Sequence, residues 1–313
     1  MIKLRSYAKV NLYLEVGPRQ SDGYHPIDSV MQSVDLADEV TVDWGTDAGS
    51  AGDVDMDRRR LDLREERTSA GPAIKMECNR PDVPVGEANI AARAARAFFE
   101  AISYSSDRPG AVTIRLKKRI PVAAGLAGGS GNAAAVLLAL NEILKTGLSL
   151  PELQKIGMTT GADIPFCIQG GTARVRGLGE IVEPIPAGSQ TLLPLPAHII
   201  LVKPPVFVST KEAYDALDKA GAVQKELGSQ TALPSKCFNR FESVIAARHP
   251  VIGEIKTALQ KAGAGEAVMS GSGPTVFGFF ADEETALAAL EKIRVSYPES
   301  FLAQPIDRGV QIL

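Results

Sequence analysis

The chain has 313 residues, of which 45% are hydrophobic and 23% charged, the balance of an ordinary globular protein of roughly two domains. Its 34 basic and 37 acidic residues give a net charge of −3, so neither nucleic acid nor an anionic membrane is an expected partner. The three cysteines, Cys78, Cys167 and Cys237, are widely spaced and form neither a disulfide framework nor a zinc pattern.

The first residues, Met1–Tyr7, enter a strand-like pattern at once and lack the features of a signal peptide. No apolar run is long enough to span a bilayer. Together with the unpaired cysteines, these features predict a cytoplasmic protein without a membrane partner.

Apolar and polar residues alternate near the beginning of the chain. Ile2–Val16 is expected to form a pair of strands, with Lys9 and Asn11 on the same face. Gln20–Pro26 is rich in turn residues, and Ser29–Val42 returns to alternation, which predicts more sheet.

The composition changes in Gly45–Pro72, which is rich in Gly, Asp and Arg and has few large apolar residues. Its Arg58–Arg60 run raises the alternative of a basic arm that binds nucleic acid. Because acidic residues are interleaved with the basic ones, an exposed, solvated loop is favoured.

The rest of the chain reads as an α+β protein with mixed sheets. Pro184–Pro196 is rich in proline and is expected to connect two domains, residues 1–183 and 184–313. The second half alternates strand, helix, helix, strand, helix, strand, which predicts a ferredoxin-like domain and a further strand in the tail. Helical patterns cover Asn89–Tyr104, Leu150–Gly157 after the capping residue Ser149, Lys211–Ala220, Cys237–Ala262 and Glu283–Val295, and strand patterns cover Ala111–Leu116, Gly170–Val182, His198–Val202 and both ends of Ala267–Phe280.

Pro121–Ala135 is a glycine-rich loop that leads into an uninterrupted helical run, Ala133–Lys145. Ser130 or Asn132 is expected to cap that helix. Unpaired backbone N–H groups at a helix start attract anions, phosphate above all. A close-packed connection is the simpler alternative, but the glycines, the cap and the helix together favour a phosphate cradle. The spacing matches neither a Walker loop nor a dinucleotide fingerprint.

Asp163 stands in an apolar frame, Gly161–Pro165, where a carboxylate needs partners. It is either a turn or capping residue or a base that orients or deprotonates a hydroxyl. Lys9 is a candidate partner unless it is a surface residue on an edge strand. A Lys–Asp pair would place a cation beside a transferring phosphoryl group.

Two further stretches have both structural and functional interpretations. Met269–Thr275 is rich in Gly and Ser between two apolar strands, and is a tight hairpin turn or part of a site. Tyr24 and His25 present an aromatic ring and a hydrogen-bonding ring on a turn, where loop packing is the common role.

These motifs together resemble the GHMP kinase superfamily, whose three signatures match Lys9–Leu12, Pro121–Ala134 and Met269–Pro274 in order. The resemblance implies a two-domain fold, an ATP-binding domain of residues 1–183 and a ferredoxin-like domain of residues 184–313, with the active site between them. Four stretches resemble one branch of the superfamily in particular. The kinases of this branch act on a cytidine-diphosphate-linked methylerythritol in non-mevalonate isoprenoid synthesis. The four stretches are Ala8–Leu14, Asp22–His25, Gly161–Phe166 and Gly170–Glu180.

The resemblance implies ATP-dependent phosphorylation of the 2-hydroxyl of that small-molecule substrate, with Mg²⁺ as cofactor, by a monomer or weak homodimer. Asp163 is implied as the catalytic base and Lys9 as its cationic neighbour. The implied substrate-binding residues are Asn11 near the reacting hydroxyl, Tyr24 and His25 at the cytosine, and Tyr214 as the opposite stacking face. The implied ATP-binding residues are Asn89 and Lys118 at the adenine, and Pro121, Val122, Ala123, Ala124, Gly125, Leu126, Ala127, Gly128, Gly129, Ser130, Gly131 and Asn132 at the phosphates.

The chain departs from the family at Gly131, where many relatives have serine, so a hydrogen bond from that hydroxyl is missing here. Two alternatives stay open. Another GHMP kinase, of the mevalonate, homoserine or galactose type, would lack the Asp22–His25 turn. A non-catalytic nucleotide-binding relative is opposed by the presence of both Lys9 and Asp163.

Overall fold

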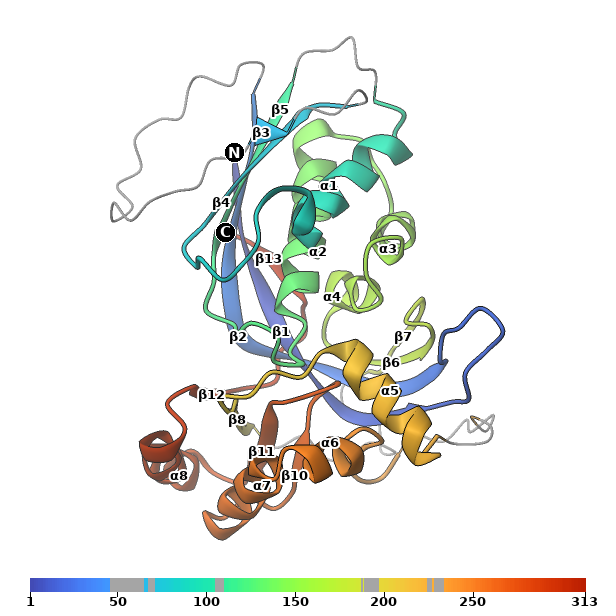
Figure 1. The fold of residues 1–313 in the computed structure, drawn as a ribbon. Coiled ribbons are helices and arrows are strands. Elements are labelled where there is room, and N and C mark those ends of the chain that lie inside the picture. The colour runs from blue at the N-terminus through green and yellow to red at the C-terminus, as the bar shows by residue number, and fades with distance from the viewer. Residues whose placement is uncertain are drawn as a thin grey trace.

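The computed structural model describes residues 1–45, 65–66, 71–104, 110–186, 188, 197–223, 227 and 234–313. Most of the predicted loop Gly45–Pro72 and of the predicted connection Pro184–Pro196 lies outside these residues. The described chain forms two parts, each a sheet covered by helices (Figure 1). Within the described residues, no helix combines the length and apolar character needed to cross a membrane.

The larger sheet has the strand order β13-β1-β2-β5-β4-β3, with β6 on β2, β7 on β6 and β9 on β1. Ile2–Val16 is one continuous strand and not the predicted pair, because its antiparallel partner comes after the turn at residues 17–26. The strands are β1 (Ile2–Val16), β2 (Ile27–Gly45), β3 (Glu65–Glu66), β4 (Ala73–Cys78), β5 (Ala111–Lys117), β6 (Thr172–Gly177), β7 (Ile181–Pro184), β9 (Phe238–Asn239) and β13 (Val310–Ile312).

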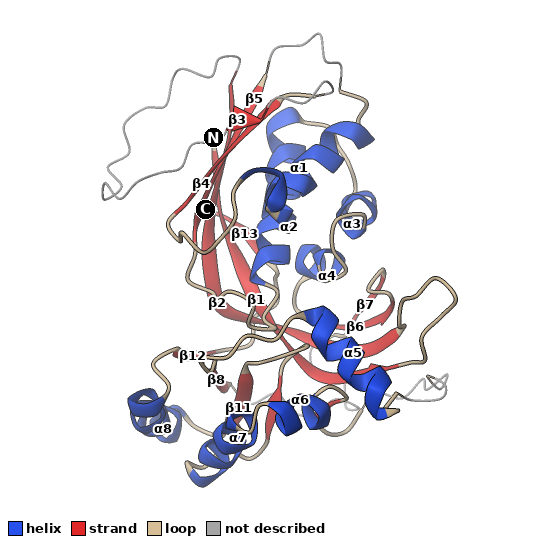
Figure 2. Cartoon of the chain, in the orientation of Figure 1, coloured by secondary structure: helices blue, strands red, loops and turns tan. Residues whose placement is uncertain are grey.

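Helices cover one side of this sheet (Figure 2). The small residues of Ala133–Ala135 let one of them approach the sheet closely, and all are fully buried. Glu152 accepts hydrogen bonds from the backbone N–H and the hydroxyl of Ser149, which confirms the predicted helix start there. The helices are α1 (Ile90–Ala101), α2 (Gly128–Leu144), α3 (Leu150–Met158) and α4 (Ile164–Gln169), with a short 3₁₀ helix at Gly86–Ala88.

The smaller sheet has the order β10-β11-β8-β12, with every neighbouring pair antiparallel. One strand, three helices, two strands, one helix and a last strand follow one another in this part, so three helices stand where the β-α-β-β-α-β pattern has its first helix. The strand order of the sheet confirms the ferredoxin-like prediction. Its strands are β8 (His198–Val202), β10 (Ala267–Met269), β11 (Val276–Phe280) and β12 (Ser300–Ala303). Its helices are α5 (Thr210–Ala220), α6 (Glu242–Arg248), α7 (Val251–Lys261) and α8 (Glu283–Ser296).

The prediction of helix throughout Cys237–Ala262 is wrong in two places. Phe238–Asn239 pairs in parallel with β1, and the Asn239 side chain accepts a hydrogen bond from the N–H of Phe241 at the turn that follows. A break at His249 separates α6 from α7, because the residue before a proline disfavours the helical conformation.

The two parts meet across a third hydrophobic cluster. Val10 and Leu12 of β1 pack there with Leu201 of β8 and Phe277 of β11. Since neighbouring residues of a strand face opposite sides, Lys9 and Asn11 point away from this hydrophobic cluster. The chain also returns at its end to the larger sheet through β13, so the division at residues 183 and 184 stays a prediction.

Candidate active site

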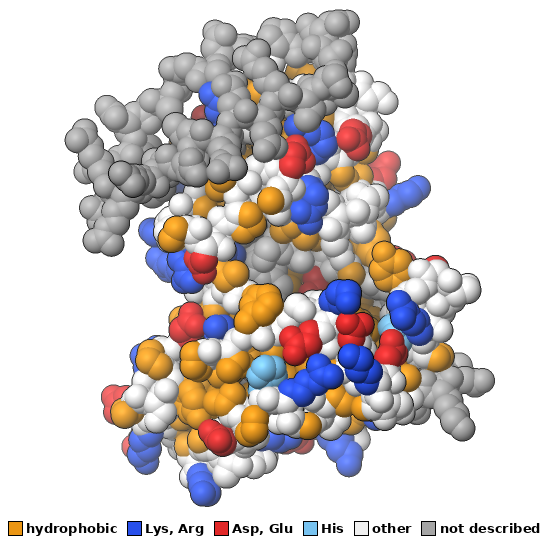
Figure 3. All heavy atoms as spheres, viewed as in Figure 1, with side chains coloured by type: hydrophobic (Ala, Val, Ile, Leu, Met, Phe, Trp, Pro, Cys, Tyr) orange, Lys and Arg blue, Asp and Glu red, His pale blue; other side chains and the backbone are white. Residues whose placement is uncertain are grey.

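A cavity of about 720 Å³ opens between the two parts, where the surface is hollowed (Figure 3). The cavity is lined by residues of β1, the loop before α2, the residues just before α4, the beginning of α5, and the turn between β10 and β11. The predicted site residues that line it are Lys9, Asn11, Asn89, Lys118, Pro121, Val122, Ala123, Ala124, Gly125, Leu126, Ala127, Gly128, Gly129, Ser130, Asn132, Asp163 and Tyr214. The predicted residues Tyr24, His25 and Gly131, which the structure also describes, are not part of this lining.

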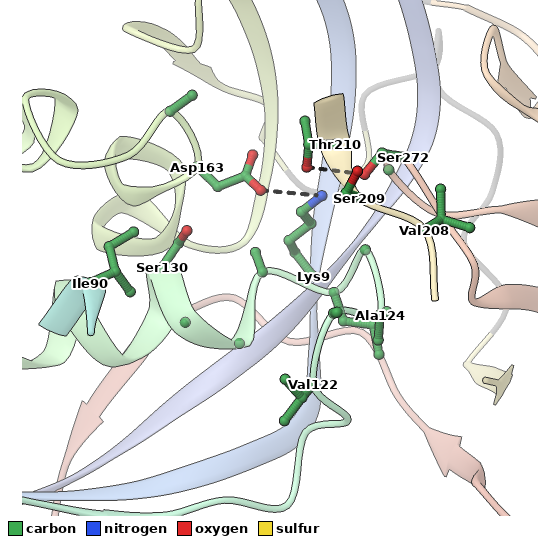
Figure 4. A pocket seen from close by; sticks show the side chains of 18 of the residues that line it. Lys9, Ile90, Val122, Ala124, Ser130, Asp163, Val208, Ser209, Thr210 and Ser272 are labelled. Carbon is green, nitrogen blue, oxygen red and sulfur yellow. Dashed lines mark hydrogen bonds and ion pairs between the residues drawn. The ribbon is translucent and has the colours of Figure 1, made fainter. Parts of the chain in front are cut away.

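Lys9 and Asp163 lie together in this cavity (Figure 4). The Lys9 Nζ atom is 3.6 Å from the nearer carboxylate oxygen of Asp163, and it donates a hydrogen bond of 2.6 Å to the side-chain oxygen of Asn11. The Lys9 side chain is 4% exposed and belongs to a strand paired on both sides. The alternative of a surface lysine on an edge strand is therefore excluded.

Asp163 immediately precedes α4 but makes no side-chain capping hydrogen bond with that helix. Its side chain is 33% exposed, which leaves part of the carboxylate open to the cavity. The capping alternative is therefore excluded, and the carboxylate is free to contact Lys9 and a bound hydroxyl.

The glycine-rich loop bends sharply before α2. Gly125 has a φ of +74°, and a Cβ atom there would lie 2.3 Å from the carbonyl oxygen of Ser270. Ala123 and Ala127 also have positive φ, which is uncommon for residues with a side chain. Such strained backbone concentrates at ligand sites, which favours the cradle over a simple close-packed connection.

Helix α2 begins at Gly128, five residues before the predicted helical run. Ala127 is the residue before the helix, and no side chain caps it, so the predicted capping by Ser130 or Asn132 is wrong. The first N–H groups of any helix lack partners within it, and this helix begins with the glycines Gly128 and Gly129. A Cβ atom at Gly131 would contact the carbonyl oxygen of Tyr7 at 3.2 Å, so that position faces β1.

A buried acid, Asp38, organises the wall beside the cradle. Its carboxylate accepts hydrogen bonds from the backbone N–H groups of Arg119 and Ile120 at 2.7 and 2.9 Å, and pairs closely with the ammonium of Lys118. The Asn132 side chain donates to the same carboxylate at 3.0 Å and accepts from Lys118 at 2.9 Å. Asp38 thus ties together two cavity-lining side chains, and the sequence analysis did not identify it.

Asn89 serves as the capping residue of α1. Its side-chain oxygen accepts a hydrogen bond from the N–H of Ala91 at 2.9 Å, and its amide nitrogen donates to the carbonyl of Pro84 at 2.7 Å. The position predicted for the adenine pocket therefore has a structural role, and it also borders the cavity.

The predicted cytosine residues are only partly brought together. His25 is buried, and its ring stacks on that of Tyr214 with centroids 5.1 Å apart. The two ring nitrogens of His25 lie 2.9 Å from the carbonyl oxygen of Gly17 and 3.3 Å from the carboxylate of Asp218. Burial, and then the charge of Asp163, raises the pKa of Tyr214 to about 12. Tyr24 is 65% exposed.

Several lining residues were not predicted. Ser209 caps α5 by accepting a hydrogen bond from the N–H of Glu212 at 3.1 Å, a pattern that the sequence does show. The hydroxyl of Thr210 lies 3.4 Å from that of Ser272, which belongs to the turn between β10 and β11 (Figure 4). This turn is a hairpin and also borders the cavity, so both interpretations of Met269–Thr275 hold.

Among the described residues, the cavity offers few side chains that could bind a metal ion. In the part of the chain that the structure describes, no group of three His, Cys, Asp or Glu residues could hold a metal ion by itself. Mg²⁺ commonly keeps several waters and takes one or two carboxylates together with substrate phosphates. The partly exposed carboxylate of Asp163, in the same cavity as the predicted phosphate cradle, fits that manner of binding.

Comparisons with known proteins agree with this geometry. Family models described as the N-terminal domain and the C-terminal domain of GHMP kinases match residues 89–171 and 213–299. The 4-diphosphocytidyl-2-C-methyl-D-erythritol kinase of Alkaliphilus oremlandii is 37% identical over 321 aligned positions, which cover 99% of this chain and 99% of the relative. The enzyme of the same name from Geobacter sulfurreducens is 41% identical over 303 positions, covering 94% and 95%.

Among solved structures, the crystal structure of a 4-(cytidine 5'-diphospho)-2C-methyl-D-erythritol kinase has a TM-score of 0.71 at 29% identity, covering 97% of this chain and 99% of that one. A homoserine kinase from Cytophaga hutchinsonii has a TM-score of 0.65 at 18% identity, covering 100% and 97%, which shows a shared fold. Because it is similar to these relatives over nearly its whole length and matches both GHMP kinase domains, the chain belongs to the 4-diphosphocytidyl-2-C-methyl-D-erythritol kinase family of GHMP kinases.

Proposed function

We propose that this chain transfers the γ-phosphoryl group of ATP to the 2-hydroxyl of 4-diphosphocytidyl-2-C-methyl-D-erythritol, a step in non-mevalonate isoprenoid synthesis. The observation that carries the proposal is the ion pair of Lys9 and Asp163, which lies in the same cavity as the glycine-rich start of α2. Phosphoryl transfer requires positioning and charge stabilisation more than covalent help from the protein, and this cavity offers both.

The start of α2 is the proposed site of the ATP phosphates. Its unpaired N–H groups and the positive end of its dipole attract negative charge. Lys118 and Asn89 border the same cavity and are proposed to form the wall of the adenine pocket. A Mg²⁺ ion, when bound to the phosphates, would neutralise charge that develops during transfer.

Asp163 is proposed to orient the acceptor hydroxyl and to take its proton. The hydroxyl oxygen forms a bond to the γ-phosphorus, the bond between that phosphorus and the bridging oxygen of ADP breaks, and the hydroxyl proton goes to the carboxylate. Lys9 stabilises the negative charge on the oxygens around it. Asn11 fixes Lys9 through its side-chain oxygen, while its amide nitrogen donates to the hydroxyl of Ser29 at 2.9 Å.

The cytidine end of the acceptor is proposed to lie against Tyr214, which borders the cavity and is held by the ring of His25. Tyr24 is on the same turn as His25 and is proposed to cover the other face of the base. An aromatic pair of this kind binds a flat ring by stacking.

A coupled assay of ADP release tests the proposal with four acceptors, the cytidyl compound, mevalonate, homoserine and galactose. We expect release that depends on the cytidyl compound and is inhibited by CDP. Preferred turnover of mevalonate, homoserine or galactose would reassign the chain to another GHMP activity. No release with any acceptor, from protein that binds ATP, would indicate a non-catalytic relative.

A further inference from the structure

Residues 306–312 leave the smaller sheet and lie along the first strand of the larger one. Val310–Ile312 forms β13, in which Val310 is opposite Ser6. The carbonyl of Gly309 accepts a hydrogen bond of 2.9 Å from the N–H of Tyr7, and the Tyr7 hydroxyl donates one of 2.6 Å to the side chain of Gln311. This segment is therefore fixed to β1 two residues before Lys9.

The same segment also contacts α4, the helix that follows Asp163. A Cβ atom on Gly309 would lie 1.9 Å from the carbonyl oxygen of Cys167, and one on Gly170 would lie 1.8 Å from the nitrogen of Gly309. The φ of Gly309 lies outside the left-handed region, so the contact alone requires a glycine there. Two backbones are thus packed directly against each other with no side chain between them.

The contact on α4 is close to the catalytic carboxylate. The N–H of Cys167 donates a hydrogen bond of 3.0 Å to the carbonyl of Asp163, so one helical turn joins the contact to that residue. Burial raises the pKa of the Cys167 thiol, the charge of Asp163 raises it further, and the charge of Lys9 lowers it. Moving α4 away from the segment would therefore move Asp163.

We propose that residues 306–312 are a positioning element that sets the separation between the Lys9 ammonium and the Asp163 carboxylate. The element contacts the backbone of β1 on one side and the backbone of α4 on the other. The proposal rests on the proposed roles of Lys9 and Asp163. A misplacement of about 1 Å at a reacting group costs on the order of a hundredfold in rate, so small shifts are measurable.

Gly309→Ala is the main test, because the added methyl group must push the segment and α4 apart. We expect kcat to fall at least about tenfold, with KM for ATP and for the cytidyl acceptor within about twofold of the parent values. Gly253→Ala is the matched control, since Gly253 has no atom within 4 Å of an added Cβ, and its kinetics should match the parent. Rates are expressed per folded protein, measured by circular dichroism. Unchanged kcat in Gly309→Ala would overturn the proposal.

A double-variant cycle separates positioning from general destabilisation. Once Asp163 is replaced by asparagine, there is no carboxylate to misplace, so adding Gly309→Ala should change kcat by less than about twofold. Equal losses in both backgrounds would show a merely structural role and overturn the proposal. Full activity of Asp163→Asn alone would instead contradict the proposed function.

Gln311→Ala gives the same test in a milder form, should Gly309→Ala not fold. It removes the 2.6 Å hydrogen bond to Tyr7 and introduces no clash. We expect a fall in kcat of about twofold to fivefold that disappears in the Asp163→Asn background. A fall that persists undiminished in that background would overturn the proposal.

Discussion

The Nζ atom of Lys9 lies 3.6 Å from a carboxylate oxygen of Asp163, although one belongs to the first strand and the other precedes the fourth helix. The lysine side chain is almost fully buried, whereas a third of the Asp163 side chain is exposed. A buried cation needs a fixed partner, so the pair holds its geometry before any substrate arrives. The acceptor hydroxyl can therefore approach a carboxylate that is already oriented.

Asp38→Asn tests the network under the cradle. The change removes the anion that pairs with Lys118 and leaves that ammonium buried without its charge partner. We expect a loss of about 3–5 kcal/mol in the free energy of unfolding, the usual cost of breaking a buried pair. The KM for ATP should rise several-fold, because Lys118 and Asn132 both lose a fixed contact.

Urea unfolding and initial rates measure these two effects. Asp215→Asn is the control, because Asp215 forms an exposed pair with Lys211 one helical turn away, and such pairs contribute little. Asp38→Asn with the stability and KM of the control would show that the network has no role in ATP binding.

Gly125→Ala tests the contact between the cradle and the turn after β10. The added Cβ atom would lie 2.3 Å from the carbonyl oxygen of Ser270, so the loop has to move. We expect kcat/KM for ATP to fall at least about tenfold, because the N–H groups proposed to bind phosphate are displaced.

Gly147→Ala is the matched control for that change. Gly147 has a φ of +70° but nothing within 4 Å of an added Cβ, so it shares the backbone strain and lacks the contact. In both variants the left-handed conformation should lower the free energy of unfolding by about 1–2 kcal/mol. Gly147→Ala should nevertheless keep its activity. Equal activities in the two variants would contradict the role of the contact.

Tyr24→Ala tests the proposed stacking on the cytosine. Tyr24 is exposed in this structure, so its removal should leave the free energy of unfolding almost unchanged. We expect KM for the cytidyl acceptor to rise about tenfold or more, since a stacked base is worth roughly 1–3 kcal/mol. The KM for ATP is the internal control. An unchanged acceptor KM would remove Tyr24 from the site.

The raised pKa of Tyr214 predicts how the free energy of unfolding depends on pH at alkaline pH. Its pKa is raised to about 12 in the folded protein, so the folded state keeps this proton after the unfolded chain, with its ordinary pKa near 10, has lost it. The resulting stabilisation is fully present below about pH 10 and is lost as the pH rises through about 12. The total loss in the free energy of unfolding from this group is roughly 2–3 kcal/mol. Tyr214→Phe should show a shallower loss between about pH 10 and about pH 12 in urea unfolding. Parallel losses in parent and variant would contradict this assignment.

The sequence predicts those features that depend on local patterns. Alternation in β1 correctly places Lys9 and Asn11 on one face, and Ser149 with Glu152 correctly marks a helix start. The second sheet follows from the order of apolar segments, because a β-α-β-β-α-β sequence has few compact arrangements.

The start of α2 could not be predicted in the same way. Glycine disfavours helices, so the pattern predicts a loop up to Asn132. In the structure, added Cβ atoms would lie 2.9 Å from Ile120 at Gly128 and 3.2 Å from the Tyr7 carbonyl at Gly131, so glycine lets this helix lie close to its neighbours. Tertiary packing thus overrides local propensity at this point.

Asp38 shows a second limit of sequence analysis. Its partners Lys118 and Ile120 are about eighty residues away along the chain, and nothing in its own neighbourhood indicates burial of a charge. The same holds for Gly309 and Cys167, whose contact appears only when the chain returns to the first sheet. Such contacts depend on topology and not on the residues nearby.

The most direct test of the proposed mechanism is the turnover of Asp163→Asn with ATP and the cytidyl acceptor, measured beside its affinity for ATP. The account predicts that kcat falls by about 10²–10⁴-fold, the range for a general acid–base group, while ATP binding by titration calorimetry is unchanged. Turnover close to that of the parent enzyme would contradict the role of the Lys9–Asp163 pair.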